Sequence, residues 1–300
     1  MDSGNIGFVL LCAAFVFVMT PGLAMFYGGL VRKKNVVNTM MTSIFIIGVG
    51  IVMWVLFGYS LSFAPSGNAF IGDFRWLGLE GVSLTEGYTD DASIPNMVFS
   101  AFQMMFAVIT PALITGAVAG RMKFKSIFVF TIFWSLIVYY PLAHMVWGQG
   151  GLLGADGIGA LDFAGGDVVH ISSGVSALVL CILLGKRHDY EHSIYRIHNI
   201  PTVVLGASLL MFGWFGFNAG SALAADGLAA HAFMTTGVSA AAAMLSWMLC
   251  DVIKNKKPTL IGASTGMVAG LVGITPGAGF VPMWAAVIIG LTTSPVCYIM

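Results

Sequence analysis

A glycine-rich turn and a histidine eight residues after its aspartate form the segment DFAGGDVVH, residues 162–170. Asp162 lies where a helix N-cap is expected, and the glycine pair at 165–166 allows the backbone to bend before the helix begins. His170 then lies about one turn inside an apolar run. An imidazole in a helix of bilayer length is costly and rare, so it is a candidate for function. The pattern predicts a polar mouth with a histidine below it.

Aromatic and hydroxyl side chains lie at the ends of three other apolar runs, at the same predicted level as this turn. Phe102 and Phe106 are four residues apart and therefore share one face of a helix. Phe217 and Ser221 have the same spacing, and Trp147 ends another run. Aromatic faces, a hydroxyl and a backbone carbonyl can hold a compact cation. The spacing predicts a small-cation site, with membrane-interface anchoring for the tryptophan and helix packing for the phenylalanines as the alternatives.

The aspartate and the histidine of the turn also have structural interpretations. We favour a capping role for Asp162, whose carboxylate would bind the amides of the turn and direct the carbonyl of Ala164 outward. For His170 the alternative is a histidine that only packs between helices. A charged imidazolium would be poorly solvated below the aromatic residues, so we expect a neutral ring with one donor and one acceptor.

The remaining chemistry-bearing residues form no recognisable site. No Ser-His-Asp spacing, phosphate-binding loop or metal-ligand cluster is present in the sequence. We therefore predict no catalytic residue, no metal, no cofactor and a protein that is not an enzyme. The histidines to which we assign no role are His144, His188, His192, His198 and His231, and the cysteines interpreted as small buried hydrophobes are Cys12, Cys181, Cys250 and Cys297.

The composition identifies the class of protein that must position these residues. Of the 300 residues, 58% are hydrophobic and 9% are charged, whereas a soluble domain carries about 25% charged residues. The chain is therefore predicted to be an all-α, polytopic membrane protein. Its net charge of zero gives no electrostatic footing for a nucleic-acid partner.

Nine apolar runs reach the roughly 20 residues that a membrane-spanning helix needs. Pro21, Pro111 and Pro141 lie within or near the ends of such runs, where proline removes backbone hydrogen bonds and kinks helices. The longest connection, 64–94, is expected to form an ordered lid on the outer side. The runs are about 6–31, 37–63, 95–119, 124–146, 167–185, 199–219, 229–253, 258–274 and 281–300.

Lysine and arginine predict the orientation. Twelve of the 13 basic residues fall in alternate connections, and only Arg75 falls in the others. The positive-inside rule places those alternate connections in the cytoplasm and the N-terminus outside. We expect a multi-pass protein of the cell membrane, which is the plasma membrane or, in a bacterium with two membranes, the inner one.

Four segments resemble the ammonium transporters of the Amt/Mep/Rh superfamily, on the Amt side. These segments are long and specific and follow the family order, and the resemblance covers essentially the whole chain. They are PGLAMFYGGLVRKKN (21–35), HMVWG (144–148), DFAGGDVVH (162–170) and GWFGFNAGS (213–221).

The resemblance implies an eleven-helix fold of two inverted five-helix repeats, assembled as a homotrimer with one pore in each subunit. Residues 1–300 would form the transmembrane domain, with a first repeat at about 6–185 and a second repeat from about 199 that is incomplete at the C-terminus. The resemblance assigns ammonium recruitment to Phe106, Trp147, Ser221 and Ala164, gating to Phe106 and Phe217, the first pore histidine to His170, site organisation to Asp162, and an additional mouth aromatic to Phe102.

One family feature lies beyond the sequence given. The second pore histidine of the family lies in the tenth helix, and these 300 residues end after the ninth. His231 lies near an external loop and is not assigned that role. We expect the natural protein to continue by two helices and a cytoplasmic tail.

The expected function follows from the resemblance and agrees with simple physics. Ammonium would bind at the external aromatic site, lose a proton and cross as ammonia through a narrow hydrophobic pore lined by histidine. Potassium resembles ammonium in size and charge but has no proton to lose, so the dry pore excludes it by desolvation. The alternatives are an ammonium sensor with little flux and an intramembrane enzyme that uses His170. Expected partners are membrane lipid and a cytoplasmic PII-type signal protein, which would dock on the inner loops, especially 186–198.

Overall fold

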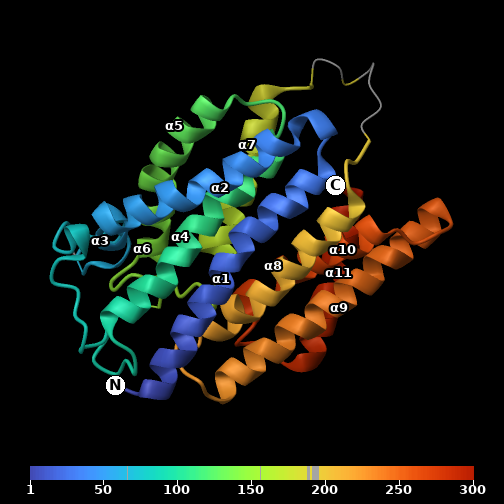
Figure 1. Cartoon of the computed structure of the whole chain (residues 1–300). Coiled ribbons are helices and arrows are strands. Elements are labelled where there is room, and N and C mark those ends of the chain that lie inside the picture. Colours follow the sequence, from blue (N-terminus) through green and yellow to red (C-terminus); the bar gives the residue numbers. More distant parts are fainter. Residues whose placement is uncertain (66, 156, 188–189, 191–195) are drawn as a thin grey trace.

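The computed structural model describes residues 1–65, 67–155, 157–187, 190 and 196–300, and this part of the chain is helical without strands. Figure 1 shows the long helices side by side, running between two ends of the molecule. The all-α prediction is confirmed. The helices are α1 (Ser3–Leu30), α2 (Val36–Met53), α3 (Tyr59–Phe63), α4 (Asn96–Val118), α5 (Phe124–Trp134), α6 (Tyr140–Trp147), α7 (Ser172–Leu184), α8 (Ile200–Gly220), α9 (Gly227–Asn255), α10 (Leu260–Ile274) and α11 (Met283–Ile299).

Eight helical segments of the described residues are long and apolar enough to cross a bilayer, and α11 is a shorter apolar helix. Three of these segments contain a π-helical stretch, at Trp54–Gly58, Ser135–Tyr139 and Gly166–Ile171. The first joins α2 to α3, the second joins α5 to α6, and the third leads into α7. Each of the nine predicted runs coincides with one apolar helical segment of the described residues, and eight of these segments are long enough to span a bilayer.

The prolines do not mark the interruptions that we expected. Pro21 and Pro111 lie inside continuous α-helices, α1 and α4. Pro141 lies at the start of α6, immediately after the π-helical stretch Ser135–Tyr139. The local departures from α-helical geometry are therefore the π-helical stretches, which in other proteins are frequent at functional sites.

Glycines bring α1 and α8 into close contact although the two helices are far apart in sequence. A β-carbon on Gly29 would lie 2.6 Å from Cγ2 of Val203, and one on Gly213 would lie 2.6 Å from the carbonyl oxygen of Phe15. A β-carbon on Gly22 would lie 2.9 Å from Cβ of Leu209 in α8. Small residues at such positions allow helix backbones to approach in lipid. We call this contact, made by Gly22, Gly29 and Gly213, the glycine seam.

The other helices arrange around this pair in two groups. Helix α4 packs against α1, α2 and α7, whereas α9, α10 and α11 pack against one another, with α8 beside α9 and α10. Figure 1 shows the second group, in orange and red, on the far side of α8 from α4. The division into two repeats, at about 6–185 and from about 199, stays a prediction.

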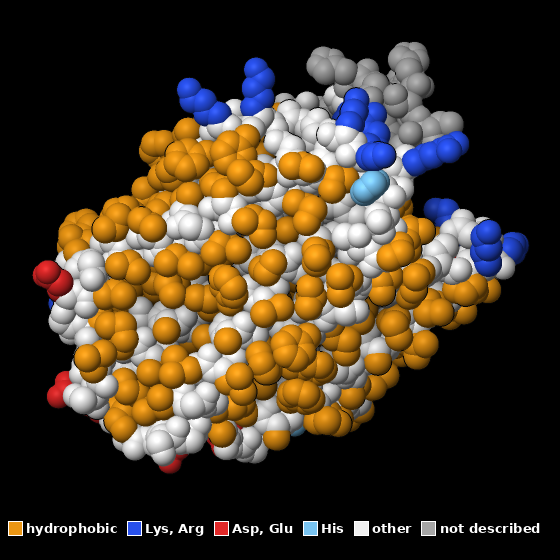
Figure 2. Space-filling view, in the orientation of Figure 1, with side chains coloured by type: hydrophobic (Ala, Val, Ile, Leu, Met, Phe, Trp, Pro, Cys, Tyr) orange, Lys and Arg blue, Asp and Glu red, His pale blue; other side chains and the backbone are white. Residues whose placement is uncertain are grey.

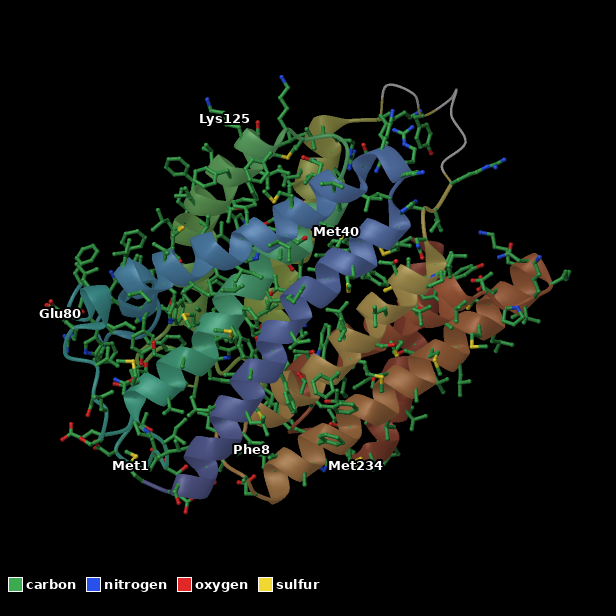
Figure 3. All side chains as sticks on the ribbon, viewed as in Figure 1. Met1, Phe8, Met40, Glu80, Lys125 and Met234 are labelled. Carbon is green, nitrogen blue, oxygen red and sulfur yellow. The ribbon has the colours of Figure 1, made fainter. Side chains whose placement is uncertain are left out.

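Charge separates the two ends of the helices. Figure 2 shows lysine and arginine gathered at one end and aspartate and glutamate at the other. Figure 3 marks these ends with Lys125 and Glu80. We call the basic end the inner end and the acidic end the outer end.

The outer connection between α3 and α4 is packed onto the helices. Trp76 stacks on Tyr59 with ring centroids 5.4 Å apart, and Tyr88 stacks on Phe99 at 4.9 Å. Arg75, the basic residue outside the predicted inner connections, pairs with Asp73 at 2.7 Å within the same loop. The described part of this connection is therefore an ordered cover over the outer end.

Candidate functional site

The turn at Asp162 is held by its own carboxylate. Oδ1 accepts hydrogen bonds from the amides of Gly165 (2.7 Å) and Gly166 (2.6 Å). Oδ2 accepts from the amides of Asp167 (2.8 Å) and Val168 (3.2 Å). The first amides of a helix have no partner inside it, and here one side chain satisfies four of them. Gly165 has a φ of 112°, a backbone conformation that residues other than glycine rarely adopt.

Helices α4 and α6 place aromatic rings against this turn. The indole N–H of Trp147, the last residue of α6, donates to the carbonyl of Asp162 at 3.1 Å. The same indole meets Phe106 of α4 edge-on, with centroids 6.0 Å apart and planes at 87°. Phe102, one turn earlier, meets Phe106 at 4.9 Å. Three rings are thus fixed beside the capped turn.

A pocket of about 620 Å³ opens at the outer end in front of these groups. The outer connection contributes Tyr88 to its wall, and burial raises the pKa of this phenol to about 12, so the hydroxyl stays protonated. The phenolic oxygen accepts a hydrogen bond from the amide of Gln149 at 3.1 Å. The candidate residues that line the pocket are Phe102, Phe106, Trp147, Asp162 and Ser221.

Ser221 offers this pocket a hydrogen-bond acceptor but no donor. It follows the last turn of α8, and its hydroxyl donates to the carbonyl of Phe217 at 2.9 Å. The proton is engaged in that bond, so the lone pairs of the oxygen remain for an incoming donor.

Stacked rings lie between the pocket and the histidine. Phe106 and Phe217 are almost completely buried and stack with centroids 4.2 Å apart and planes at 30°. Beyond them, the ring of His170 stacks on Phe217 at 6.0 Å and on Trp214 at 5.3 Å. Phe217 and His170 do not line the pocket. Phe106 does, and it contacts Phe217, which in turn contacts His170. Ala164 is buried at 1% exposure, within the capped turn.

The two histidines in the middle of the described helices differ in their partners. Nε2 of His170 is buried and has no hydrogen-bond partner among the described residues. His144 lies 3.1 Å from the carbonyl of Ser62 through Nδ1 and 2.8 Å from the carbonyl of Asn68 through Nε2. His144 therefore has the contacts of a packing histidine, and His170 leaves a ring nitrogen available.

Contacts are described for two of the remaining four histidines. His231 binds the carbonyl of Val281 at 2.8 Å through Nε2, and the amide of His198 donates to Gly29. His188 and His192 lie outside the described residues. Across the described ranges, no three His, Cys, Asp or Glu side chains are grouped so that they could hold a metal ion.

Sequence reasoning missed three residues of this region. Gln103 lines the outer pocket, and its Oε1 is buried without a partner among the described residues. Trp214 supports the ring of His170 and donates its N–H to Thr275 at 2.9 Å. Asn218, next to Phe217, donates to Thr236 at 2.9 Å, and its own Oδ1 is left without a partner in the same described part. For Gln103 and Asn218 the available signal was an amide side chain inside an otherwise apolar run.

The comparisons with known proteins identify a family. The model of the Ammonium Transporter Family matches residues 7–300. The ammonium transporter of Bacillus subtilis (strain 168) is 52% identical over 99% of this chain, which covers 72% of that protein.

Solved structures give the same result. Mep2 of Saccharomyces cerevisiae superposes with a TM-score of 0.92 at 39% identity, covering all of this chain and 66% of that one. A protein described as "Sensor Amt Protein" gives a TM-score of 0.88 at 29% identity, covering 99% of this chain and 74% of that one. The chain thus spans about two thirds of the yeast protein and somewhat more of the other two relatives. The chain belongs to the ammonium transporter family.

Proposed function

We propose that this chain conducts ammonium nitrogen across the membrane, taking up ammonium in the outer pocket and passing it inward as ammonia. The observation that carries the proposal is the continuous series from the acceptor-lined pocket, through the Phe106–Phe217 stack, to the unpartnered Nε2 of His170. The family assignment supports the substrate class, since the relatives are named ammonium transporters.

The pocket would capture the charged form. Trp147 and Phe106 offer aromatic faces, which attract a desolvated cation by about 2 kcal/mol or more. Ser221 offers an oxygen whose own proton is already engaged. The carbonyl of Ala164 is proposed as a further acceptor, and Phe102 as an aromatic at the mouth. An ammonium ion has four N–H donors and suits such a set of acceptors.

The ring stack would then select for the neutral form. Moving an ion into a dry, apolar path costs several kcal/mol even after relaxation of the protein. Ammonium avoids this cost by losing a proton, whereas potassium cannot. We propose that Phe106 and Phe217 form the gate at which this loss becomes necessary.

Below the gate, His170 would offer the polar atom that the path needs. Its ring lies against both Phe217 and Trp214, which also contact each other, and this packing restricts its orientation. A neutral imidazole can donate or accept one hydrogen bond through its free nitrogen. This arrangement supports a role in passing ammonia inward or in relaying the released proton.

The assembly and orientation are proposed on the family resemblance and on the charge pattern. We propose a homotrimer with the eleven-helix, two-repeat fold, in which the N-terminus faces outward and the basic end faces the cytoplasm. A PII-type signal protein would dock on the inner loops. The loop 186–198 is part of this proposal, and its residues 188–189 and 191–195 lie outside the described residues.

The direct test is flux in vesicles. The protein that contains this chain, purified at its natural length and reconstituted in liposomes, is expected to acidify or alkalinise the lumen when an ammonium gradient is applied. Electrical current recorded in parallel distinguishes proton relay over His170 from return of the proton to the outer side. Empty liposomes and liposomes with Asp162→Ala protein are the controls. Absence of flux from well-folded protein would contradict the proposal.

A sensor is the second candidate, because one structural relative carries that description. A sensor would bind ammonium in the outer pocket without measurable flux. Binding measured by calorimetry or by tryptophan fluorescence, together with an absence of flux in the same preparation, would favour it over transport.

A further inference from the structure

One side chain ties the start of α1 to two distant segments at the outer end. The amide of Asn5 is used at both of its polar atoms. Nδ2 donates to Oγ of Ser93 at 2.9 Å, and Oδ1 accepts from the backbone amide of Ala225 at 2.9 Å. Ser93 belongs to the outer connection before α4, and Ala225 belongs to the connection between α8 and α9. Figure 1 shows the N-terminus at the same end of the molecule as the start of α9.

Further bonds complete this junction. The backbone amide of Asp2 donates to the carbonyl of Ser93 at 2.8 Å, and the carboxylate of Asp2 accepts from the amide of Asn5. Oγ of Ser93, which accepts from Asn5, donates in turn to the carbonyl of Leu223 at 3.5 Å. We call the side-chain contacts that join Asn5, Ser93, Leu223 and Ala225 the rim latch. They connect three segments that are far apart in the sequence.

The rim latch lies at the edge of the outer pocket. Ser93 and residues 222–224 line that pocket, whereas Asn5 is not among the described residues that line it. Ser221, whose oxygen is the acceptor proposed for ammonium, comes directly before residues 222–224. Because these residues follow one another in a single turn after α8, a displacement of the turn would carry the hydroxyl of Ser221 with it.

The turn has a conformation that needs support from outside. Leu223 has a φ of 57°, in the left-handed region that leucine adopts only at a cost in free energy. Such a backbone persists where the surrounding structure holds it. Here the carbonyl of Leu223 binds Ser93, and the amide of Ala225 binds Asn5. The side chain of Leu223 packs against the hydrophobic core. The rim latch therefore supplies side-chain hydrogen bonds on both sides of the strained residue.

We propose that Asn5 is a positioning residue for ammonium capture, whose side-chain amide holds the turn after Ser221 and with it the acceptor oxygen of the outer pocket. This role rests on the proposed function, since capture of ammonium in that pocket is part of it. Asn5 acts through Ser93 and Ala225, so its replacement leaves every proposed ligand group of the pocket in the protein. A carboxamide suits the position because it offers donors and an acceptor on one planar group.

The first test is transport by Asn5→Leu, which keeps the size of the side chain and removes both hydrogen bonds. The protein at its natural length is reconstituted in liposomes. The apparent KM for ammonium is expected to rise about three- to tenfold, since the acceptor is displaced but not removed. The maximal rate should stay within about twofold of the parent, because the ring stack and His170 are untouched. An unchanged KM in folded protein would overturn the proposal.

Two further variants separate positioning from general destabilisation. Asn199→Leu removes an amide side chain that caps the start of α8 at the inner end. It should lower the unfolding temperature and leave the KM unchanged, and an equal rise in KM in both leucine variants would overturn the proposal. Ser93→Ala combined with Asn5→Leu should add little to the effect of Asn5→Leu, since both changes break one latch. Fully additive effects on the KM would overturn the shared role.

A readout that does not depend on flux distinguishes failure of this role from failure of transport. Hydrogen exchange at the amides of residues 223–225 is expected to be about tenfold faster in Asn5→Leu than in the parent. Unchanged exchange would overturn the latch. Methylammonium binding is measured by tryptophan fluorescence in the same preparations. If the parent binds methylammonium without flux, transport fails as the function, and the latch still predicts a weaker dissociation constant in Asn5→Leu. A parent protein with neither binding nor flux would overturn the capture role of Asn5 as well.

Discussion

The capped turn and the path below it treat buried polar groups in opposite ways. At the turn every oxygen of the Asp162 carboxylate accepts backbone hydrogen bonds, and nearby His144 has a carbonyl oxygen at both ring nitrogens. Gln103 of α4, His170 and Asn218 of α8 each keep a buried polar atom without a partner among the described residues. The protein itself supplies the hydrogen bonds of the Asp162 carboxylate, whereas Nε2 of His170 is left without a partner among the described residues.

We call the hydrogen-bonded turn at Asp162 the scaffold, and the series from the outer pocket through the Phe106–Phe217 stack to His170 the path. A buried polar group without a partner typically costs about 1–3 kcal/mol, and native proteins keep few of them. Buried side-chain oxygens without a partner among the described residues also occur away from the aromatic stack, on Thr20, Thr39 and Ser62. The ring nitrogen of His170 differs from these oxygens because its ring stacks on Phe217, and we infer that its partner is the passing solute or the water that precedes it.

The largest expected effect follows from breaking the scaffold. Asp162→Ala removes acceptors for four amides, and each hydrogen bond to a charged group is worth about 1.5–3 kcal/mol. We expect transport to be lost and the protein to be markedly less stable. Asp162→Asn, which can still cap, should retain part of both.

Uptake of labelled methylammonium and thermal unfolding of the purified variants measure these two effects. An alanine variant that is folded as well as the parent and transports normally would contradict the scaffold role.

The second effect tests the path itself. His170→Glu would place a fixed negative charge below the gate and lower the barrier for intact cations, so we expect potassium or ammonium to pass as ions. His170→Ala should instead reduce ammonium transport. The measurements are current and potassium uptake in liposomes.

The matched control is His144→Ala, which removes a histidine with two carbonyl contacts. This change should lower the unfolding temperature without admitting potassium. If the His170→Glu protein excludes potassium as well as the parent does, His170 is a packing histidine like His144.

The third effect concerns capture in the outer pocket. Trp147→Leu or Ser221→Ala should raise the apparent KM for ammonium by about two- to thirtyfold, corresponding to about 0.5–2 kcal/mol for each contact. Uptake measured across external pH tests whether the charged form is affected.

Two matched variants control for helix effects. Ser208→Ala removes a hydroxyl that binds the carbonyl four residues earlier in the same helix, as Ser221 does, but outside the pocket. Trp284→Leu changes an exposed tryptophan of α11. A rise in KM that the controls share would argue against a cation site.

The smallest effect sharpens the contrast at a single atom. Gln103→Leu removes a buried, unpartnered Oε1 from a residue that lines the outer pocket. We expect the unfolding temperature to stay the same or rise, since an unsatisfied buried acceptor is removed, while the KM rises about two- to fivefold. A lower unfolding temperature with an unchanged KM would show that the amide belongs to the scaffold.

The sequence predicts the scaffold best where its contacts are local. The amides that Asp162 binds lie three to six residues further on, so an aspartate before two glycines and an apolar run was enough to indicate the cap. The all-α architecture and its nine apolar helical segments follow from hydropathy alone. The family resemblance is confirmed by the comparisons, and the functional roles of the candidate residues stay predictions.

Contacts between distant segments could not be foreseen in the same way. The carbonyls that bind His144 come from Ser62 and Asn68, 82 and 76 residues earlier. A pocket at the inner end is lined by Arg32, Arg187 and Arg196 from separate parts of the chain, which the sequence indicates only as basic inner connections. The hydrophobic periodicity of the sequence does not indicate the π-helical stretches. The prolines, which predicted kinks, lie at other positions.

The glycine seam limits how this protein can move during its cycle. At Gly29 and Gly213, backbone and side chains of α1 and α8 already meet without room for a methyl group. Swinging one helix group against the other would separate surfaces in full van der Waals contact, and that packing would be lost. The smaller motion that remains is rotation of the rings of Phe106 and Phe217. We therefore expect throughput to follow side-chain fluctuation rather than domain rocking, with a shallow temperature dependence more typical of a pore than of a carrier.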